Sequence, residues 1–114
     1  MRIVSWNVQR AVANDEVWQV LLELNPDIIL LQEVIDFSDT FTSKYSTFHK
    51  HAVKENGEKQ VFGTAIAIKG EIVSEISLSS EIEWVDKGID YFEGNLLSAV
   101  IRTSNGKQFN VVSA

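Results

Sequence analysis

The chain has 114 residues, of which 45% are hydrophobic, and a formal net charge of −6 at pH 7. This length and apolar content are typical of one packed globular domain or part of one, and they exclude a disordered tail. The acidic balance argues against a protein that attracts nucleic acid over its whole surface, because such proteins carry a basic stripe. A phosphate ligand would therefore have to be held locally, for example through a metal ion.

The chain contains no cysteine, so it has neither a disulfide framework nor a thiolate metal site. Its start, MRIVSWNV, lacks the layout of a signal peptide, and no apolar run has the length that a membrane-spanning helix requires. We therefore expect a cytoplasmic protein that does not insert into a membrane.

The first third of the chain predicts a strand, a helix and a second strand. Residues 2–8 are rich in β-branched and aromatic side chains and predict a strand. A helix with apolar residues at helical spacing follows, with Asn14 as its N-cap and with Asn25 and Pro26 at its end. Residues 27–33 form an almost continuous apolar run, which is typical of a strand covered on both faces. This order indicates a βαβ unit with two parallel strands.

The rest of the chain predicts short strands, hairpins and one short helix. Asn-Gly pairs at residues 56–57 and 105–106 are strong signals for hairpin turns. Residues 79–94 hold acids and aromatics without a clean period, and they predict a loop. The other expected elements are a short helix that starts at Ser38, a strand from the KGEIV segment to Ser77, and strands at residues 45–53, 60–69, 96–103 and 107–113.

These elements predict an α/β fold, with a mixed, mainly antiparallel β-sheet, a βαβ start and β-hairpins. The strands carry apolar side chains on both faces, as in Ile28 and Leu30 against Ile29 and Leu31. We expect one sheet, of which one clear helix covers a single face, so that the other face drives self-association or aggregation. The final FNVVSA stops in an apolar strand, and we expect residues 1–114 to be the amino-terminal part of one domain, truncated at its carboxyl end.

A polar residue stands at the end of each parallel strand, Asn7 in the first and Glu33 in the second. Ligands bind at the carboxyl ends of the strands in open α/β sheets. Neighbouring strands lie about 4.8 Å apart, so one amide oxygen and one carboxylate could reach the same small cation. Magnesium suits such oxygen ligands, and it is usually held by one or two carboxylates and a substrate phosphate. The alternative interpretation is that Asn7 caps a turn and that Glu33 is solvated at a strand end.

The segments RIVSWNV, LNPDIILLQEV and FGTAIAIKG together resemble the amino-terminal half of the endonuclease/exonuclease/phosphatase superfamily, which includes the exonuclease III-like and DNase I-like phosphoesterases. The resemblance implies half of a four-layered α/β/β/α sandwich and a reaction that depends on Mg²⁺ or Mn²⁺. It also implies that Glu33 is the metal ligand, and that Asn7 orients the metal shell and the scissile phosphate. Both residues are then part of the catalytic site.

The sequence also departs from the pattern of that family. Gln9 stands where similar DNA-repair enzymes often carry Asp or Asn, which weakens an assignment to abasic-site repair and leaves Gln9 as a candidate substrate-binding residue. Similar enzymes need a His or Tyr after the strand that ends here in VVSA, an Asp-x-Asn motif and a terminal Asp-His pair. Residues 1–114 contain none of these groups, so the resemblance implies that this chain alone is nearly inactive.

For the parent protein we predict metal-dependent hydrolysis of a phosphodiester or phosphomonoester, with nucleic acid among the candidate substrates. The alternative is a non-catalytic binding or assembly module with the same fold. An Asp-x-Asn motif and a terminal Asp-His pair in the residues after Ala114 would favour the enzyme.

Other residues offer weaker candidates for sites. His49 and His51 alternate on one strand face and could bind zinc, although a partly solvated strand face is the simpler interpretation. Trp84, Tyr91 and Phe92 could stack on a nucleobase or cover a sheet edge. Acids separate the lysines at 44, 50, 54 and 59, which predicts a solvated face, and the small residues Gly63, Ala65 and Ala67 predict close packing.

Overall fold

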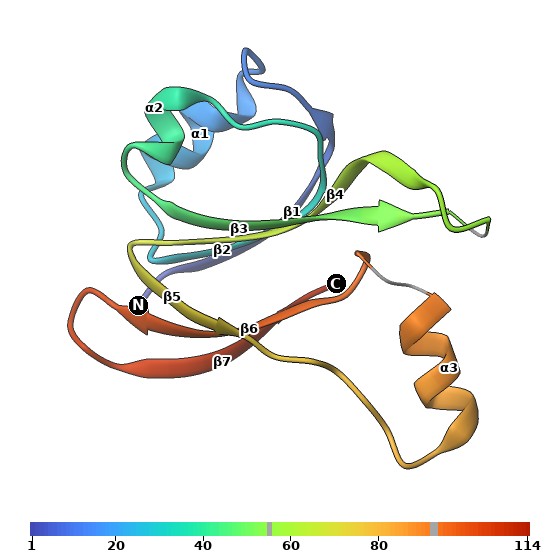
Figure 1. Ribbon diagram of the computed structural model, residues 1–114. Helices are drawn as coiled ribbons and strands as arrows, with labels where there is room; N and C mark the ends of the chain where they lie inside the picture. Colours follow the sequence, from blue (N-terminus) through green and yellow to red (C-terminus); the bar gives the residue numbers. More distant parts are fainter. Residues whose placement is uncertain (55, 92–93) are drawn as a thin grey trace.

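The computed structural model describes residues 1–54, 56–91 and 94–114, and these ranges contain seven strands and three helices (Figure 1). The first part of the chain forms β1 (Ile3–Ala11), α1 (Val17–Leu24), β2 (Ile28–Val34), α2 (Asp39–Thr42), β3 (Ser46–Val53) and β4 (Lys59–Ile68). The second part forms β5 (Gly70–Glu75), α3 (Glu83–Tyr91), β6 (Leu97–Thr103) and β7 (Gln108–Ser113).

The strands form two sheets that lie face to face. The larger sheet has the order β1-β2-β4-β3, in which β1 and β2 are parallel and β4 is antiparallel to both of its neighbours. The smaller sheet is antiparallel, with the order β5-β6-β7. Helices α1 and α2 cover the side of the larger sheet that faces away from the smaller one (Figure 1). The α/β fold with a mixed sheet is thus confirmed, and its layers are those of part of an α/β/β/α sandwich.

An aromatic and aliphatic core closes the helical side of the larger sheet. Trp18 of α1 and Phe41 of α2 are buried there, with their ring centroids 4.9 Å apart. Both belong to the same cluster as Ile29 of β2 and the two small residues Ala65 and Ala67 of β4. The small side chains let the helical layer lie close to the sheet, as the alternation along β4 predicts.

The other side of the larger sheet packs on the smaller sheet through aliphatic residues. This second core joins Ile28, Ile66 and Ile68 of the larger sheet with Leu97, Ala99 and Ile101 of the smaller one. The prediction of a single sheet with one bare face is therefore wrong. Gly70 has a φ of 148°, and a Cβ there would overlap the carbonyl oxygen of Arg102, so glycine lets the chain leave β4 and begin at once beside β6.

The predicted βαβ unit is confirmed, although its helix begins later than expected. Helix α1 starts at Val17, and its first residues lack the predicted cap at Asn14. Instead, the Asp15 carboxylate accepts a hydrogen bond from the Val12 N–H at 2.7 Å and closes a turn before the helix. At the other end Asn25 takes the left-handed conformation, with a φ of 52°, as an asparagine at a helix C-terminus sometimes does.

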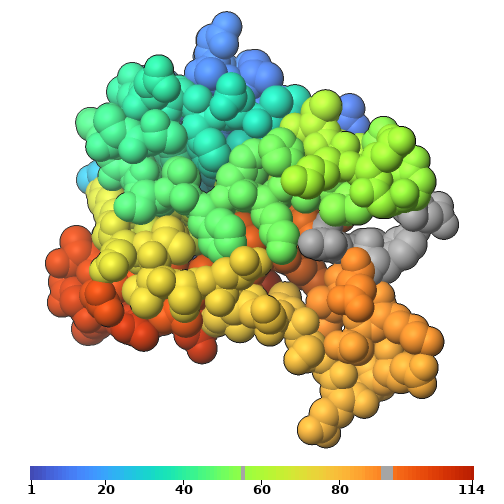
Figure 2. Space-filling view, viewed as in Figure 1, coloured from blue at the N-terminus to red at the C-terminus, as the bar shows by residue number. Residues whose placement is uncertain are grey.

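The loop predicted at residues 79–94 is wrong in its middle, where α3 forms. The Ser80 hydroxyl accepts a hydrogen bond from the Ile82 N–H at 3.1 Å, and the Ser80 N–H donates to the Asp86 carboxylate at 3.0 Å. These bonds close a turn just before the helix. Glu83, the acid of the Ser-x-x-Glu pattern that starts at Ser80, pairs with Lys87 at 2.9 Å instead. Helix α3 projects from the body of the molecule, away from α1 and α2 (Figure 2).

The remaining predicted elements are confirmed within a few residues. Helix α2 follows Ser38, whose hydroxyl accepts a hydrogen bond from the Phe41 N–H at 3.0 Å. Both hairpin turns carry the expected glycine at positive φ, 86° at Gly57 and 85° at Gly106. The turns therefore set the pairing of β3 with β4 and of β6 with β7.

Candidate functional site

Asn7 and Glu33 lie together at one end of the gap between the two sheets. Their strands are parallel neighbours, and Asn7 stands opposite Gln32. Both Asn7 and Glu33 line a pocket of about 270 Å³, together with Gln32, Phe62, Gly63, Thr64, Asn95 and Ala114. The structure thus brings the two predicted site residues to one place, and their chemical roles stay predictions.

A bulge in β2 turns Glu33 toward this pocket. Leu31 and Val34 both belong to the helical-side core, so two residues instead of one lie between consecutive core positions. Opposite them on β4, Thr64 is the single residue between the partners of Leu31 and Val34. Glu33 takes the left-handed conformation, with a φ of 57°. Strict alternation would have buried Glu33 under the helices, and the bulge brings it to the side of Asn7 instead.

A second bulge, in β1, follows Asn7. Val8, Gln9 and Arg10 stand between the partners of Gln32 and Val34, where β2 has Glu33 alone. Gln9 and Arg10 are both left-handed, with φ of 53° and 63°. The Asn7 Oδ1 atom accepts a hydrogen bond from the Gln9 N–H at 3.0 Å, which holds the start of this turn. Strained backbone of this kind costs about 1–3 kcal/mol per residue and clusters at functional sites.

The smaller sheet supports the floor of the pocket. The Gln32 Nε2 atom donates to the Ser113 hydroxyl of β7 at 3.1 Å, and that hydroxyl donates to the Leu31 carbonyl at 3.3 Å. On the β4 side, a Cβ at Gly63 would overlap the Lys50 carbonyl oxygen, so the close approach of β3 requires glycine. Gly63 also pairs with Val34 of β2, so the end of β2 is held by both β4 and the smaller sheet.

The groups that line the pocket suit a hard cation. Glu33 offers a carboxylate, and Asn7, Gln32 and Asn95 offer amide oxygens. Magnesium and manganese accept such oxygen ligands and keep several waters. Within the described ranges no three or more His, Cys, Asp or Glu side chains gather into a metal-binding group. The residues therefore fit a metal that is held by one carboxylate and completed by water and a substrate.

Sequence reasoning missed Asn95 and Thr64, which have no local motif, and it placed Gln9 differently. Gln9 lines a separate pocket of about 260 Å³ with Trp6, Asn7, Val8 and Val17, and it is not among the residues around Glu33. Its backbone, through the bond to Asn7, is the part of Gln9 that touches the site. The substrate-binding role of the Gln9 side chain stays a prediction.

His49 and His51 are neighbours, with ring centroids 4.9 Å apart, but they lie outside this pocket. Each ring bonds to a backbone carbonyl, His49 to Val34 at 3.0 Å and His51 to Gln60 at 3.1 Å. His49 also packs edge-on against Phe37 on the helical side of the sheet. Burial lowers the pKa of His49. These contacts are those of packed strand residues, which agrees with the simpler interpretation.

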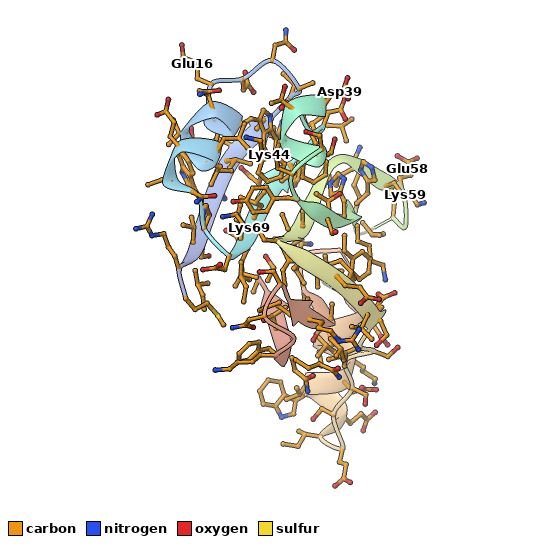
Figure 3. All side chains as sticks on the ribbon, turned by 90° about the vertical axis from the view of Figure 1, so that its left-hand side faces the viewer. Glu16, Asp39, Lys44, Glu58, Lys59 and Lys69 are labelled. Carbon is orange, nitrogen blue, oxygen red and sulfur yellow. The ribbon has the colours of Figure 1, made fainter. Side chains whose placement is uncertain are left out.

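The described lysines form no continuous basic patch. Lys50 pairs with Glu75 at 3.2 Å, and Lys54 is 3.9 Å from Glu58. Figure 3 shows Lys44 beside the helices, whereas Lys59 lies at the far hairpin next to Glu58. The predicted solvated face describes these lysines well.

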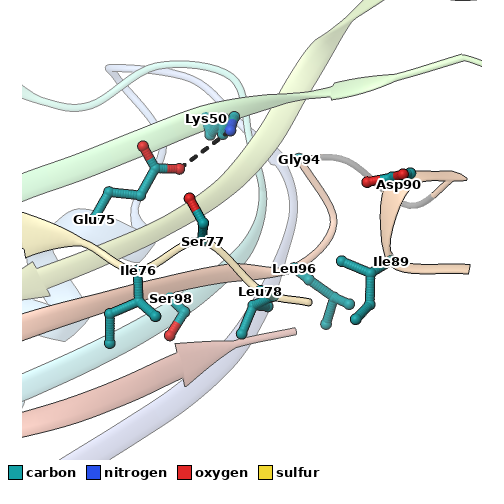
Figure 4. A pocket seen from close by; sticks show the side chains of 10 residues that line it. All are labelled: Lys50, Glu75, Ile76, Ser77, Leu78, Ile89, Asp90, Gly94, Leu96 and Ser98. Atoms are coloured by element: carbon teal, nitrogen blue, oxygen red, sulfur yellow. Dashed lines mark hydrogen bonds and ion pairs between the residues drawn. The ribbon is translucent and has the colours of Figure 1, made fainter. Parts of the chain in front are cut away.

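A second pocket, of about 210 Å³, lies between β3, the end of β5, α3 and the segment before β6 (Figure 4). The Lys50–Glu75 ion pair crosses one side of it, and Asp90 lies on another. With two acids to one lysine, this pocket is a poor phosphate site.

Among the aromatic candidates, Trp84 is 77% exposed on α3, so it does not cover a sheet edge. The Tyr91 side chain and Phe92 lie outside the part of the chain that the structure describes. The stacking role proposed for these aromatics stays a prediction.

Among the residues that the structure describes, no helix is both long enough and apolar enough to span a membrane.

Comparisons with known proteins show the family to which the chain belongs. The profile of the endonuclease/exonuclease/phosphatase family matches residues 4–103, from β1 to the end of β6, and this range includes Asn7 and Glu33. No curated protein and no solved structure matched the chain. A profile match over most of the chain, on two stacked sheets with helices on one outer face, shows that the chain belongs to the endonuclease/exonuclease/phosphatase family.

Proposed function

We propose that the pocket around Asn7 and Glu33 is the site of metal-dependent phosphoester hydrolysis in the protein that carries this chain. Membership in a family of phosphoesterase hydrolases supports the reaction class. One observation carries the proposal: a bulge in β2 turns Glu33 to the side on which Asn7 of β1 lies, so that two neighbouring parallel strands line a single polar pocket. A regular β2 strand would have placed Glu33 under the helices.

Each residue has a distinct task in this proposal. The Glu33 carboxylate holds Mg²⁺ or Mn²⁺, and the Asn7 amide orients the scissile phosphate beside it. With Mg²⁺ or Mn²⁺ bound beside Glu33, the site would supply positive charge for the phosphate oxygens and for the leaving oxygen. The hydrogen bond from the Gln9 N–H fixes the Asn7 amide, so its orientation is set before a substrate arrives.

Activation of water is the step to which the described residues contribute least. The two histidines bond to backbone carbonyls and do not line the pocket. A positioned general base is typically worth a factor of about 10² to 10⁴ in rate. We therefore expect very low turnover from residues 1–114 tested alone.

The test is a phosphoesterase assay of the full-length protein, on a panel of phosphodiesters and phosphomonoesters with and without Mg²⁺. We expect Mg²⁺-dependent turnover that Glu33→Gln abolishes. Glu71→Gln is the matched control, because Glu71 is an exposed carboxylate on the smaller sheet that pairs with Arg102 at 2.7 Å. Turnover that survives Glu33→Gln would contradict the proposal.

The second candidate is a binding or assembly module that keeps the fold without the chemistry, because a pocket lined by one carboxylate and several amide side chains also suits a bound cation or ligand that does not react. This candidate predicts that the full-length protein binds Mg²⁺ at Glu33 and turns over no member of the panel. The same assay therefore separates the two.

We also propose that the chain self-associates, through the outer face of the smaller sheet. Val100 and Val112 belong to this face, and Val112 is 48% exposed. Helices α1 and α2 cover the opposite side of the molecule (Figure 1). Sedimentation should show dimers that Val112→Lys disrupts and Val20→Lys on α1 does not. A monomer at high concentration would contradict this proposal.

A further inference from the structure

Arg10 reaches back over the candidate site. It lies in the left-handed part of the β1 bulge, with a φ of 63°. Its guanidinium carbon lies 4.8 Å from the centroid of the Phe62 ring on β4. Strand β2 runs between β1 and β4, so the side chain crosses the end of β2, where Glu33 lies. The bulge that follows Asn7 therefore places a cation at the rim of the Asn7–Glu33 pocket.

The partner of Arg10 sets it apart from the other two arginines of the chain. Arg2 donates to the Leu24 carbonyl, and Arg102 pairs with the Glu71 carboxylate at 2.7 Å. Within the described ranges, the ion pairs found do not include Arg10. An aromatic face holds a guanidinium in place but satisfies none of its five N–H donors. Arg10 is thus oriented and keeps its donors for another acceptor.

The charge of the whole molecule makes this position informative. At a net charge of −6, the protein repels an anion over most of its surface. Phe62 lines the pocket itself, so the guanidinium that rests on its ring lies next to the space where a ligand would bind. A local cation at that place offsets the repulsion where an anionic ligand must enter.

We propose that Arg10 is a substrate-binding residue that donates to the phosphate group of the ligand in the Asn7–Glu33 pocket, with Phe62 holding it in place before binding. The planar guanidinium fork matches two oxygens of one phosphate, which a lysine ammonium does not. This inference rests on the proposed function, because it takes the ligand of the pocket to be a phosphoester.

The test uses residues 1–114 with inorganic phosphate as the probe, in the presence of Mg²⁺. Phosphate affinity and the NMR signal of the Arg10 Nε–H are followed in one titration. We expect the Arg10 signal to shift, and Arg10→Gln to weaken phosphate binding by about tenfold, the effect of losing one charge-assisted hydrogen bond. Arg10→Lys should recover part of the loss, because it restores the charge without the fork. Arg102→Gln is the matched control and should bind phosphate like the wild type.

Two measurements, Mg²⁺ affinity and phosphate affinity, distinguish a failure of this inference from a failure of the proposed function. Mg²⁺ affinity without phosphate is measured for the wild type and for Glu33→Gln, and equal affinities would overturn the proposed function. Wild-type phosphate affinity in Arg10→Gln, or an Arg10 signal that phosphate does not move, would overturn the role of Arg10 alone. A wild-type chain that binds no phosphate would also overturn that role, whatever the Mg²⁺ titration shows.

Discussion

The two ends of the parallel pair β1–β2 are built differently. From Ile3 opposite Ile28 to Trp6 opposite Leu31, the strands pair residue by residue. Beyond Asn7, both strands bulge, and Gln9, Arg10 and Glu33 take left-handed backbone conformations. The regular half supplies side chains to both hydrophobic cores, whereas the irregular half brings Glu33 to the polar pocket beside Asn7 and Gln32. Val8, Ala11 and Val34 of the irregular half still belong to the helical-side core.

Under the proposed function, this difference lets one pair of strands serve both stability and the candidate site. Regular alternation commits every second side chain to a core, so a polar residue needed at a site must escape that alternation. The bulges take Glu33 and Arg10 out of this alternation. They require strained backbone at both residues, and the packing of the regular half of the same strands offsets that strain. We therefore expect substitutions in the two halves to have different effects on unfolding and on binding.

The largest effect on stability should come from the regular half. Ile29→Ala removes a buried side chain from the helical-side core, and we expect the free energy of unfolding to fall by about 2–5 kcal/mol. Chemical denaturation measures it. Val20→Ala, at a 41% exposed position on α1, is the control and should stay close to the wild type. A loss below about 1 kcal/mol for Ile29→Ala would contradict the claim that the regular half of the strand pair carries the core stability.

A smaller effect should come from the link that holds the irregular end. Ser113→Ala removes the hydroxyl that joins Gln32 to the Leu31 carbonyl, and it leaves polar groups without partners. We expect a loss of about 1–3 kcal/mol in the free energy of unfolding, together with weaker Mg²⁺ binding, because Gln32 lines the pocket. Ser104→Ala in the exposed β6–β7 turn serves as the control. If Mg²⁺ affinity is unchanged, the second sheet does not support the site.

Unlike the two preceding substitutions, Glu33→Gly should not lower the free energy of unfolding. Glycine removes the strain of a left-handed residue, about 1–2 kcal/mol, and adds about 0.5–1 kcal/mol of backbone entropy cost. We expect a protein as stable as the wild type, or more stable by up to about 1 kcal/mol, that no longer binds Mg²⁺. Thermal unfolding and a metal titration check the two halves of this statement. A clear loss of stability would mean that Glu33 contributes to folding and not only to the site.

The smallest effect concerns the pH dependence of stability. Burial, ahead of the other causes, lowers the pKa of His49 below its usual 6.5, so the unfolded chain binds a proton more readily than the folded one. The folded state therefore loses stability as the pH falls below about 6.5, until the folded His49 is also protonated. His49→Gln should remove this slope between pH 7 and 5. His51→Gln should reduce it only in part, because the charge of His51 is one cause of the shift. An unchanged slope in His49→Gln would assign it to other groups.

The sequence predicted the regular parts of the molecule well, for a physical reason. Alternation on β4 and the apolar run of β2 report burial on each face directly, and the Asn-Gly pairs report their own turns. Hence the strands, the βαβ unit and the positions of Asn7 and Glu33 at the ends of neighbouring strands could be predicted from local patterns, whereas the bulge that brings Glu33 to the side of Asn7 could not.

What the sequence did not predict depends on contacts distant along the chain. Alternation does not show that β5 leaves the first sheet at Gly70, because strands of either sheet need two covered faces. The bulges have no local signal either, since Gln9, Arg10 and Glu33 are not residues that favour positive φ. Asn95 and Phe62 line the pocket from segments that are distant along the chain from Asn7 and Glu33. The turn before α3 depends on a hydrogen bond between Ser80 and Asp86, six residues apart, which is not a standard capping motif.

A titration of residues 1–114 with Mn²⁺ tests the proposed metal site directly, because Mn²⁺ broadens the NMR signals of nearby nuclei. We expect substoichiometric Mn²⁺ to broaden the backbone signals of the pocket residues first, and we expect Glu33→Gln to remove this selective broadening while Glu71→Gln keeps it. The pocket residues to follow are Asn7, Gln32, Glu33, Gly63, Thr64 and Asn95. Broadening that begins instead at the acidic residues of α3, or that Glu33→Gln leaves unchanged, would contradict the claim that the bulged ends of β1 and β2 form a metal site.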